Sequence, residues 1–428
     1  MLKSVNPFRE YSIFVLFLVS ETNERKEDGA SSFPMRADFM RSRSSSVLSL
    51  VSVAVALVGV CPPALAAPGT VVVVAEGLPP QVLDLGRGYL RATDEDAMLS
   101  TAFDELKGKG QSAVVGDDAL AQLGGILQTA HDNGYATGLV TTGDVTKVAP
   151  MFYTLPGDIA ADLTAAEAPY EFLAGGGADK FEGEGAKMTD DGNTFVDSAE
   201  RLDGVLTGKI LVAESPGDLG YSIDRDPTQQ SGFSELTTTA LDVLTSGEKP
   251  FVLIVHDTLI NKALQEHDTP ALFEQFREMN TVLGDANAHR FDNPDLKIAA
   301  LMTSAPVTVA PGAASPTEQN AIFLSIANLQ KSFAGAGAGL KGKTVGEITD
   351  FADPDMGEYR GWTVSQADKE KIAAGTLDPE KAIRAFYEPT LKLTYAGTPS
   401  QPYGLVVGFE APDGLVAALK TLVSTPAK

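Results

Sequence analysis

The chain has 428 residues, 43% of them hydrophobic, and a formal net charge of −24. This length is ample for a large buried core. The acidic balance excludes nucleic acid and anionic lipid as natural partners, because like charges repel. It also opposes a phosphorylated substrate, unless a metal ion or a cluster of arginines reverses the local field.

A leader is expected before the folded part. Residues 35–66 combine a basic start, an apolar run and the small-residue sequence Ala64-Leu65-Ala66, which is the layout of a secretory signal peptide. Residues 1–34 hold another short apolar run. We interpret them as an over-extended N-terminus, or as a membrane-interacting segment too short to span a bilayer. Residues 67–428 then form a periplasmic or secreted domain without a membrane span.

Apolar segments that do not alternate predict strands buried on both faces. They lie at 71–75, 136–141, 170–174, 209–213, 251–255, 298–303 and 403–409. Helical patterns occur between them, at 120–130, 236–244, 269–283, 321–333, 363–387 and 415–422. This alternation predicts an α/β fold whose central, mostly parallel sheet carries helices on both faces. Ligands bind such sheets at the carboxyl ends of the strands, so we expect a site just after Val255.

Three stretches resemble segments of the alkaline phosphatase family. A-T-G-L-V-T-T-G-D-V-T-K-V-A-P at 136–150 is similar to the family's A-T-G-L-V-T-T-x-x-V-T-H-A-T-P. F-L-A-G-G-G at 172–177 resembles its triple-glycine turn, and G-Y-S-I-D-R at 220–225 resembles its P-Y-E-I-D-R. The resemblance implies an alkaline phosphatase-like sandwich and a periplasmic or extracellular phosphomonoesterase. It further implies two zinc ions and one magnesium ion, a serine nucleophile and an arginine that grips phosphate.

The first family positions are changed in this chain. Glu76 stands where the family has a metal-bridging Asp and is the one conservative replacement, although a solvated Glu at a strand end fits equally. Asp96 stands at the nucleophile position, and an acidic turn leading into a helix is the alternative interpretation. Ala149, at the position of a hydroxyl ligand to magnesium, has no donor atom. Lys147, two residues earlier, could supply an ammonium in place of a metal ion or simply be solvated.

The segment after the strand 251–255 is changed in the same way. His256 matches the magnesium-binding Glu, Asn261 matches a zinc-binding Asp, and Gln265 matches a zinc-binding His. Asn and Gln are weak, uncharged oxygen donors, and Lys262 next to Asn261 would repel a cation. His256 could still bind a soft metal together with His267, although such a pair lacks carboxylate support.

The remaining family positions offer little to a metal or to phosphate. Ala305 and Pro306 replace two ligands after the strand 298–303, and Thr398 replaces a late histidine. No arginine occurs between Arg91 and Arg201, where the phosphate-binding arginine should lie. Zinc needs three or four ligands, so we expect no cofactor, or zinc and magnesium only if the family's chemistry survives.

Two hypotheses follow for function. The first is an alkaline phosphatase-like protein that is impaired as a metal-dependent phosphomonoesterase and acts in binding or interaction, alone, as a homodimer or with an active relative. The alternative is an active phosphatase that takes a small-molecule phosphoester and has rebuilt its metal site from Glu76, Asp94, Asp96 and His256.

Overall fold

The computed structural model describes residues 67–94, 100–202, 204, 206–312, 315–353, 359, 362–397 and 401–427. All of them belong to one compact unit, Pro63–Lys428. The expected leader at 1–66 lies outside the described residues, as do Asp96 and Thr398. Within the described ranges, no helix combines the length and apolar character needed to cross a bilayer.

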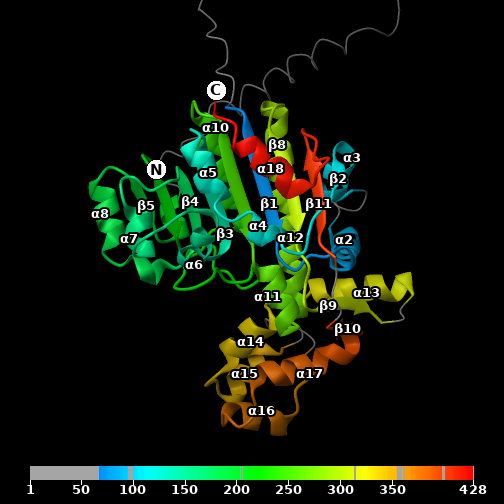
Figure 1. Cartoon of the computed structure of the whole chain (residues 1–428). Coiled ribbons are helices and arrows are strands. Elements are labelled where there is room, and N and C mark those ends of the chain that lie inside the picture. The colour runs from blue at the N-terminus through cyan, green and yellow to red at the C-terminus, as the bar shows by residue number, and fades with distance from the viewer. Residues whose placement is uncertain are drawn as a thin grey trace, which may run out of the picture. The chain divides into compact units, whose positions relative to one another are not determined.

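A sheet of nine strands forms the centre of this unit, in the order β2-β11-β8-β1-β7-β3-β4-β6-β5 (Figure 1). Its strands are β1 (Gly69–Ala75), β2 (Gln111–Ala113), β3 (Ala136–Asp144), β4 (Phe172–Gly176), β5 (Thr194–Val196), β6 (Ile210–Ala213), β7 (Phe251–Asp257), β8 (Lys297–Met302) and β11 (Tyr403–Val407). Among the described strands of this sheet, the two pairings made by β11 are antiparallel and all others are parallel, which confirms the expected mostly parallel arrangement. A separate ribbon pairs β9 (Thr308–Pro311) with β10 (Leu393–Ala396).

The central strands are buried on both faces, as their unbroken apolar runs predict. In β1, Val71 and Val73 belong to one hydrophobic core, and Val72 and Val74 belong to another. Because successive side chains of a strand point to opposite faces, the two cores lie on opposite sides of the sheet.

Helices contribute to both cores, as expected. The first core takes side chains from α2 (Pro80–Thr93), α3 (Ala102–Lys109), α9 (Ala199–Leu202), α10 (Phe233–Ser246), α11 (Leu259–Glu266), α12 (Thr269–Asp292), α13 (Pro316–Ala327), α14 (Phe333–Leu340), α15 (Val345–Phe351), α16 (Gln366–Ala373) and α17 (Pro379–Leu391). The second takes them from α4 (Ala119–Gln122), α5 (Ile126–Asp132), α6 (Val145–Phe152), α7 (Ile159–Thr164), η1 (Ala178–Phe181), α8 (Glu184–Asp190) and α18 (Leu415–Val423).

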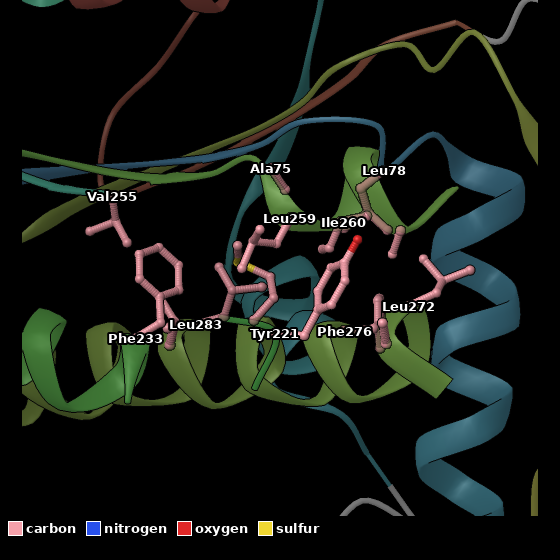
Figure 2. Packing of buried hydrophobic residues seen from close by; sticks show 14 of the residues in the cluster. Ala75, Leu78, Tyr221, Phe233, Val255, Leu259, Ile260, Leu272, Phe276 and Leu283 are labelled. Carbon is pink, nitrogen blue, oxygen red and sulfur yellow. The ribbon is translucent and has the colours of Figure 1, made fainter. Parts of the chain in front are cut away.

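Helix α12 supports the strand end at which the site was expected. Figure 2 shows Phe276 and Leu283 of α12 on one side of a layer of apolar side chains, with Val255 of β7 and Ile260 of α11 on the other. All four are buried, with at most 4% of their surface exposed. This packing fixes the direction in which the chain leaves β7 and enters α11.

Three helical predictions need correction. The helix expected over 120–130 is two helices, α4 and α5, because Gly125 adopts a left-handed conformation (φ +68°) between them. The helical stretch expected over 363–387 is also two helices, since Asp378 caps a new helix by accepting hydrogen bonds from the backbone of Glu380 and Lys381. The helix expected at 321–333 is α13, which begins after the cap residue Ser315 and ends at Ala327, and Phe333 begins α14.

Candidate functional site

Parallel pairing brings several polar residues to one edge of the sheet. Ala75 of β1 lies opposite Asp257 of β7, and His256 lies opposite Thr141 of β3. Glu76, directly after β1, therefore reaches the same edge as these residues. This is the carboxyl edge at which ligands of α/β sheets bind.

Glu76 and His256 form a direct pair. Oε1 of Glu76 lies 2.7 Å from Nε2 of His256, and the other ring nitrogen, Nδ1, lies 3.4 Å from Oγ1 of Thr141. With a neutral imidazole, the tautomer that fits both contacts has Nε2 donating to Glu76 and Nδ1 accepting from the Thr141 hydroxyl. The ring of Phe152 meets the imidazole edge-on at a centroid distance of 5.8 Å.

This hydroxyl–imidazole–carboxylate order has the same sequence of groups as a nucleophile triad. However, Thr141 and His256 are fully buried, with 0% of their surface exposed. A substrate would need to touch the hydroxyl, so the arrangement works as a structural hydrogen-bond chain that fixes the ends of β1, β7 and β3.

Asp257 is a buried carboxylate that sequence reasoning missed. Its Oδ1 accepts hydrogen bonds from Oγ1 of Thr142 at 3.1 Å and from the backbone of Leu259 at 2.6 Å, and its Oδ2 accepts from Nε2 of Gln275 at 3.2 Å. Burial raises its pKa to about 6, against the effect of the Leu259 hydrogen bond. One feature of the sequence does point to it: two polar residues, His256 and Asp257, directly follow the five apolar residues 251–255.

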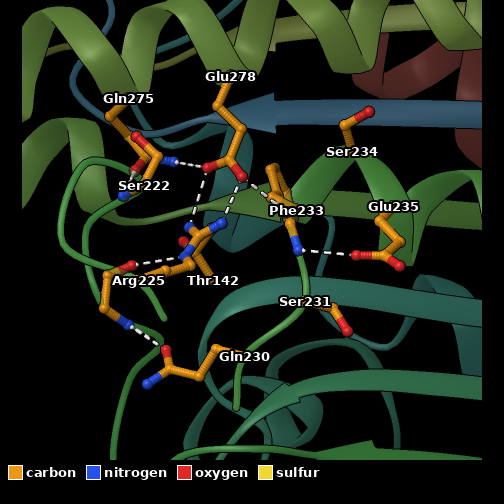
Figure 3. A network of polar contacts seen from close by, with 12 residues as sticks. Thr142, Ser222, Arg225, Gln230, Ser231, Phe233, Ser234, Glu235, Gln275 and Glu278 are labelled. Carbon is orange, nitrogen blue, oxygen red and sulfur yellow. Dashed lines mark hydrogen bonds and ion pairs between the residues drawn. The ribbon is translucent and has the colours of Figure 1, made fainter. Parts of the chain in front are cut away.

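Gln275, which donates to Asp257, also belongs to a wider polar network around Arg225 and Glu278 (Figure 3). Gln275 donates to Oε2 of Glu278 at 2.9 Å, and both guanidinium nitrogens Nη1 and Nη2 of Arg225 bind the same carboxylate. Glu278 also accepts from the backbone of Phe233, the first residue of α10, at 2.7 Å. The arginine of the I-D-R motif therefore binds Glu278 of α12, and this carboxylate in turn holds the first residue of α10.

Helix α11 carries the next group of family positions. A Cβ built on Gly77 (φ +73°) would lie 2.8 Å from the Cα of Asn261. The structure therefore places Asn261 beside the end of β1. Oδ1 of Asn261 is buried and has no hydrogen-bond partner among the described residues. Gln265 is exposed and does not join this group. Lys262 reaches Oδ2 of Asp218 at 4.0 Å.

Other predicted positions provide no ligand atom or lie elsewhere. Ala149 and Ala305 are buried, and Pro306 is exposed. Asp94, offered above as a rebuilt ligand, forms an ion pair with Arg277 at 3.3 Å. It follows the 14-residue helix α2, which begins four residues after Glu76 and rises about 21 Å, so the two carboxylates lie at opposite ends of that helix.

The residues present do not fit two zinc ions and a magnesium ion. In the part of the chain that the structure describes, no three His, Cys, Asp or Glu side chains form a group that could hold a metal ion. The best carboxylate, Glu76, already binds His256, and His256 directs its second nitrogen to Thr141. A zinc site needs three or four such donors on one ion.

The comparisons with known proteins agree on one group. No protein-family model matches the chain. The sequence is 23% identical over 168 residues to alkaline phosphatase 4 of Bacillus subtilis, a match that covers 36% of this chain and 36% of that protein. It is 26% identical over 225 residues to an alkaline phosphatase of Schizosaccharomyces pombe, covering 45% of this chain and 42% of that protein. The chain thus spans well under half the length of these curated relatives.

The solved structure of Thermus thermophilus alkaline phosphatase covers 84% of this chain and 91% of that one, with a TM-score of 0.65 at 16% identity. The fold is therefore that of the alkaline phosphatases. The two sequence matches are also to alkaline phosphatases, so the chain is similar to this group in fold and over part of its sequence.

Proposed function

We propose that the protein keeps the alkaline phosphatase scaffold but does not act as a metal-dependent phosphomonoesterase, and that it works by binding or interaction. One observation carries this proposal. Glu76, the best remaining ligand, is hydrogen-bonded to His256, which stands at another ligand position. Because Glu76 and His256 are hydrogen-bonded to each other, these two side chains are not free to bind one metal ion together.

Electrostatics support the proposal. The chain carries a net charge of −24 and has no arginine between Arg91 and Arg201. The lysines near the sheet edge, Lys147 and Lys262, each face a carboxylate, at 3.1 Å and 4.0 Å. A phosphate dianion would therefore meet neither metal ions nor a bidentate arginine, the groups that stabilise the charge of phosphoryl transfer.

The direct test is hydrolysis of p-nitrophenyl phosphate by the purified full chain, with zinc and magnesium added at neutral and alkaline pH. Thermus thermophilus alkaline phosphatase serves as the positive control. We expect a rate equal to the uncatalysed background, and the same rate for Glu76→Ala, because removal of several cooperating groups leaves little catalysis. Turnover that Glu76→Ala abolishes would establish the alternative, an active phosphatase with a rebuilt metal site.

Location and partners complete the proposal. The signal-like residues 35–66 support export to the periplasm or beyond. Without catalysis, the remaining role is contact with a ligand, a second copy of the chain or an active relative. Light scattering of the purified chain, alone and co-expressed with an active alkaline phosphatase, distinguishes a monomer, a homodimer and a mixed complex.

A further inference from the structure

A second polar cluster lies where β3 turns into α6. Asp144 is the last residue of β3 and the cap of α6, and Lys147 lies one turn further along that helix. The Lys147 ammonium folds back to within 3.1 Å of Oδ2 of Asp144. The two side chains differ greatly in exposure, 72% for Lys147 and 1% for Asp144. An exposed amine therefore neutralises a buried carboxylate.

The two oxygens of Asp144 have different surroundings. Oδ1 accepts hydrogen bonds from the backbone and the hydroxyl of Thr146, at 2.9 Å and 2.6 Å. Oδ2 is buried, and in the described part of the chain it faces only the Lys147 ammonium. Burial alone would raise the pKa of Asp144, but the hydrogen bonds from Thr146 and Lys147 outweigh burial and lower it. The carboxylate is therefore ionised, and Oδ2 depends on one amine.

Two more carboxylates act on the same ammonium from other elements. The pKa of Lys147 is raised by its hydrogen bond to Asp144 and further by the charges of Asp218 and Asp179. Asp218, in the loop after β6, accepts the backbone N–H of Asp144 at 3.1 Å through its Oδ1. Asp179 lies on η1, directly after the triple-glycine turn. Lys147 is thus the cation for the buried Asp144 and also feels the charges of Asp218 and Asp179, which have lysines of their own, Lys262 at 4.0 Å and Lys180 at 2.5 Å.

The triple-glycine turn fits closely around this cluster. The backbone N–H groups of Gly177 and Ala178 donate to the carbonyl of Ser215, at 2.6 Å and 2.7 Å. Gly177 has a left-handed backbone (φ +98°), and a Cβ there would lie 2.5 Å from Oδ1 of Asp144. Gly177 is required here because its backbone passes directly over the Asp144 carboxylate.

We propose that the Lys147 ammonium is a tethered cation that does structurally what a bound divalent metal would do at this edge, and that removing the amine turns Asp144 and Asp218 into a weak Mg²⁺ or Mn²⁺ site. This inference rests on the proposed lack of catalytic metals. Two carboxylates are enough to bind a hard divalent cation weakly, because Mg²⁺ is often held by one or two carboxylates and completes its coordination shell with water. Burying a charged oxygen without a counter-charge costs free energy of folding, so binding of a cation from solution at that oxygen becomes favourable.

The test uses the full chain after dialysis against EDTA. Lys147→Met removes the charge and keeps most of the side-chain volume. We expect the variant to melt about 2 °C below the wild type. Added Mg²⁺ should recover that loss, and loss of the free Mn²⁺ signal in electron paramagnetic resonance should report binding. The wild type should show neither response. The double variant Asp144→Asn/Lys147→Met should also show neither, because its buried oxygen is no longer charged.

Lys187→Met is the matched control. Lys187 is 70% exposed and pairs with Glu184 at 2.7 Å with the same i,i+3 spacing, but the Glu184 side chain is 32% exposed. We expect no Mn²⁺ binding by this variant. The proposal is overturned if Lys147→Met binds no Mn²⁺, if Lys187→Met binds it equally, or if sodium chloride at matched ionic strength restores the melting temperature as well as Mg²⁺ does. Lys147→Gln provides the same readout should the methionine variant fold poorly.

The outcome is separable from that of the proposed function. Phosphatase turnover by the wild type would reject the proposed function and leave the Mn²⁺ result of Lys147→Met to be judged by itself. Conversely, an inert wild type with a Lys147→Met variant that ignores Mn²⁺ would reject only the tethered cation.

Discussion

Glu76 and His256 show how single side chains change the chemistry of this sheet edge. The sequence resemblance aligns each with a metal-ligand position of alkaline phosphatases, and the 2.7 Å contact between them gives each a partner inside the protein. His256 then passes its second nitrogen to the buried Thr141. Glu76 and His256 are thus satisfied by protein atoms, whereas the buried Oδ1 of Asn261 has no hydrogen-bond partner among the described residues.

Asp257 leads to a prediction about pH. Its pKa is raised to about 6 in the folded chain, whereas an unfolded Asp titrates near 3.9. The folded state therefore binds an extra proton between about pH 4 and 6, and the associated stability is present below pH 4 and lost as pH rises through 6. The amount is on the order of 3 kcal/mol. Asp257→Asn should flatten the pH dependence of the free energy of unfolding in this window, measured by urea denaturation at a series of pH values.

The control is the exposed residue Asp117, whose change to Asn should leave the profile unaltered. Asp268 will keep part of the slope in Asp257→Asn, because burial raises its pKa to about 6 as well. An unchanged slope in Asp257→Asn would show that this carboxyl does not titrate in the folded chain as proposed.

At the scale of a residue, the sequence could predict substitutions but not their new partners. The loss of donors at Ala149, Ala305 and Pro306 is visible in the letters alone. That Lys147 neutralises Asp144 is not, because the pattern A-T-G-L-V-T-T-G-D gives no sign that its last carboxylate is buried. Burial of the Asp257 carboxylate could not be predicted for the same reason, since it depends on the packing of α12 over the end of the strand.

Helices and strands were predictable where the apolar pattern is strong. The runs at 71–75 and 251–255 became β1 and β7, and the second extends two residues further because His256 and Asp257 still pair along the strand. Strand direction was not predictable in the same way. The run at 403–409 contains β11, which is antiparallel, and an apolar run carries no information about direction.

Asp268 gives a prediction at the scale of an element. Its side chain caps α12 by accepting from the backbone of Ala271 at 3.2 Å, and it also accepts from Phe333 at 3.1 Å and Ala334 at 2.9 Å at the start of α14. Asp268→Ala removes caps from two helices, which should lower the free energy of unfolding by about 2 kcal/mol. Hydrogen exchange of the α14 amides should become faster, while exchange in α10 should change less.

Asp268→Asn is the matched variant. It keeps Oδ1, which accepts from both Ala271 and Phe333, and loses only the acceptor for Ala334. Its free energy of unfolding and its exchange rate for the α14 amides should lie between those of the wild type and those of Asp268→Ala. Equal exchange of α14 in all three proteins would mean that the start of this helix is held by other contacts, such as that between Asp224 and Ser332.

Across the whole chain, the fold is retained at low sequence identity, and our proposal is that the site is not. The fold matches an alkaline phosphatase structure over 84% of the chain at only 16% identity, because buried apolar strands tolerate exchange among similar side chains. The site depends on individual charged groups and tolerates far less. The net charge of −24 and the lysines at the sheet edge are the features from which we propose that this scaffold does not gather divalent metal ions around phosphate.

The central claim is tested most directly by measuring the metal content of the wild-type chain. The purified protein is incubated with excess zinc and magnesium, desalted, and examined by native mass spectrometry together with elemental analysis, beside Thermus thermophilus alkaline phosphatase treated identically. We predict a folded chain of apo mass without stoichiometric zinc. One or more equivalents of zinc that survive desalting and disappear in Glu76→Ala would contradict the central claim.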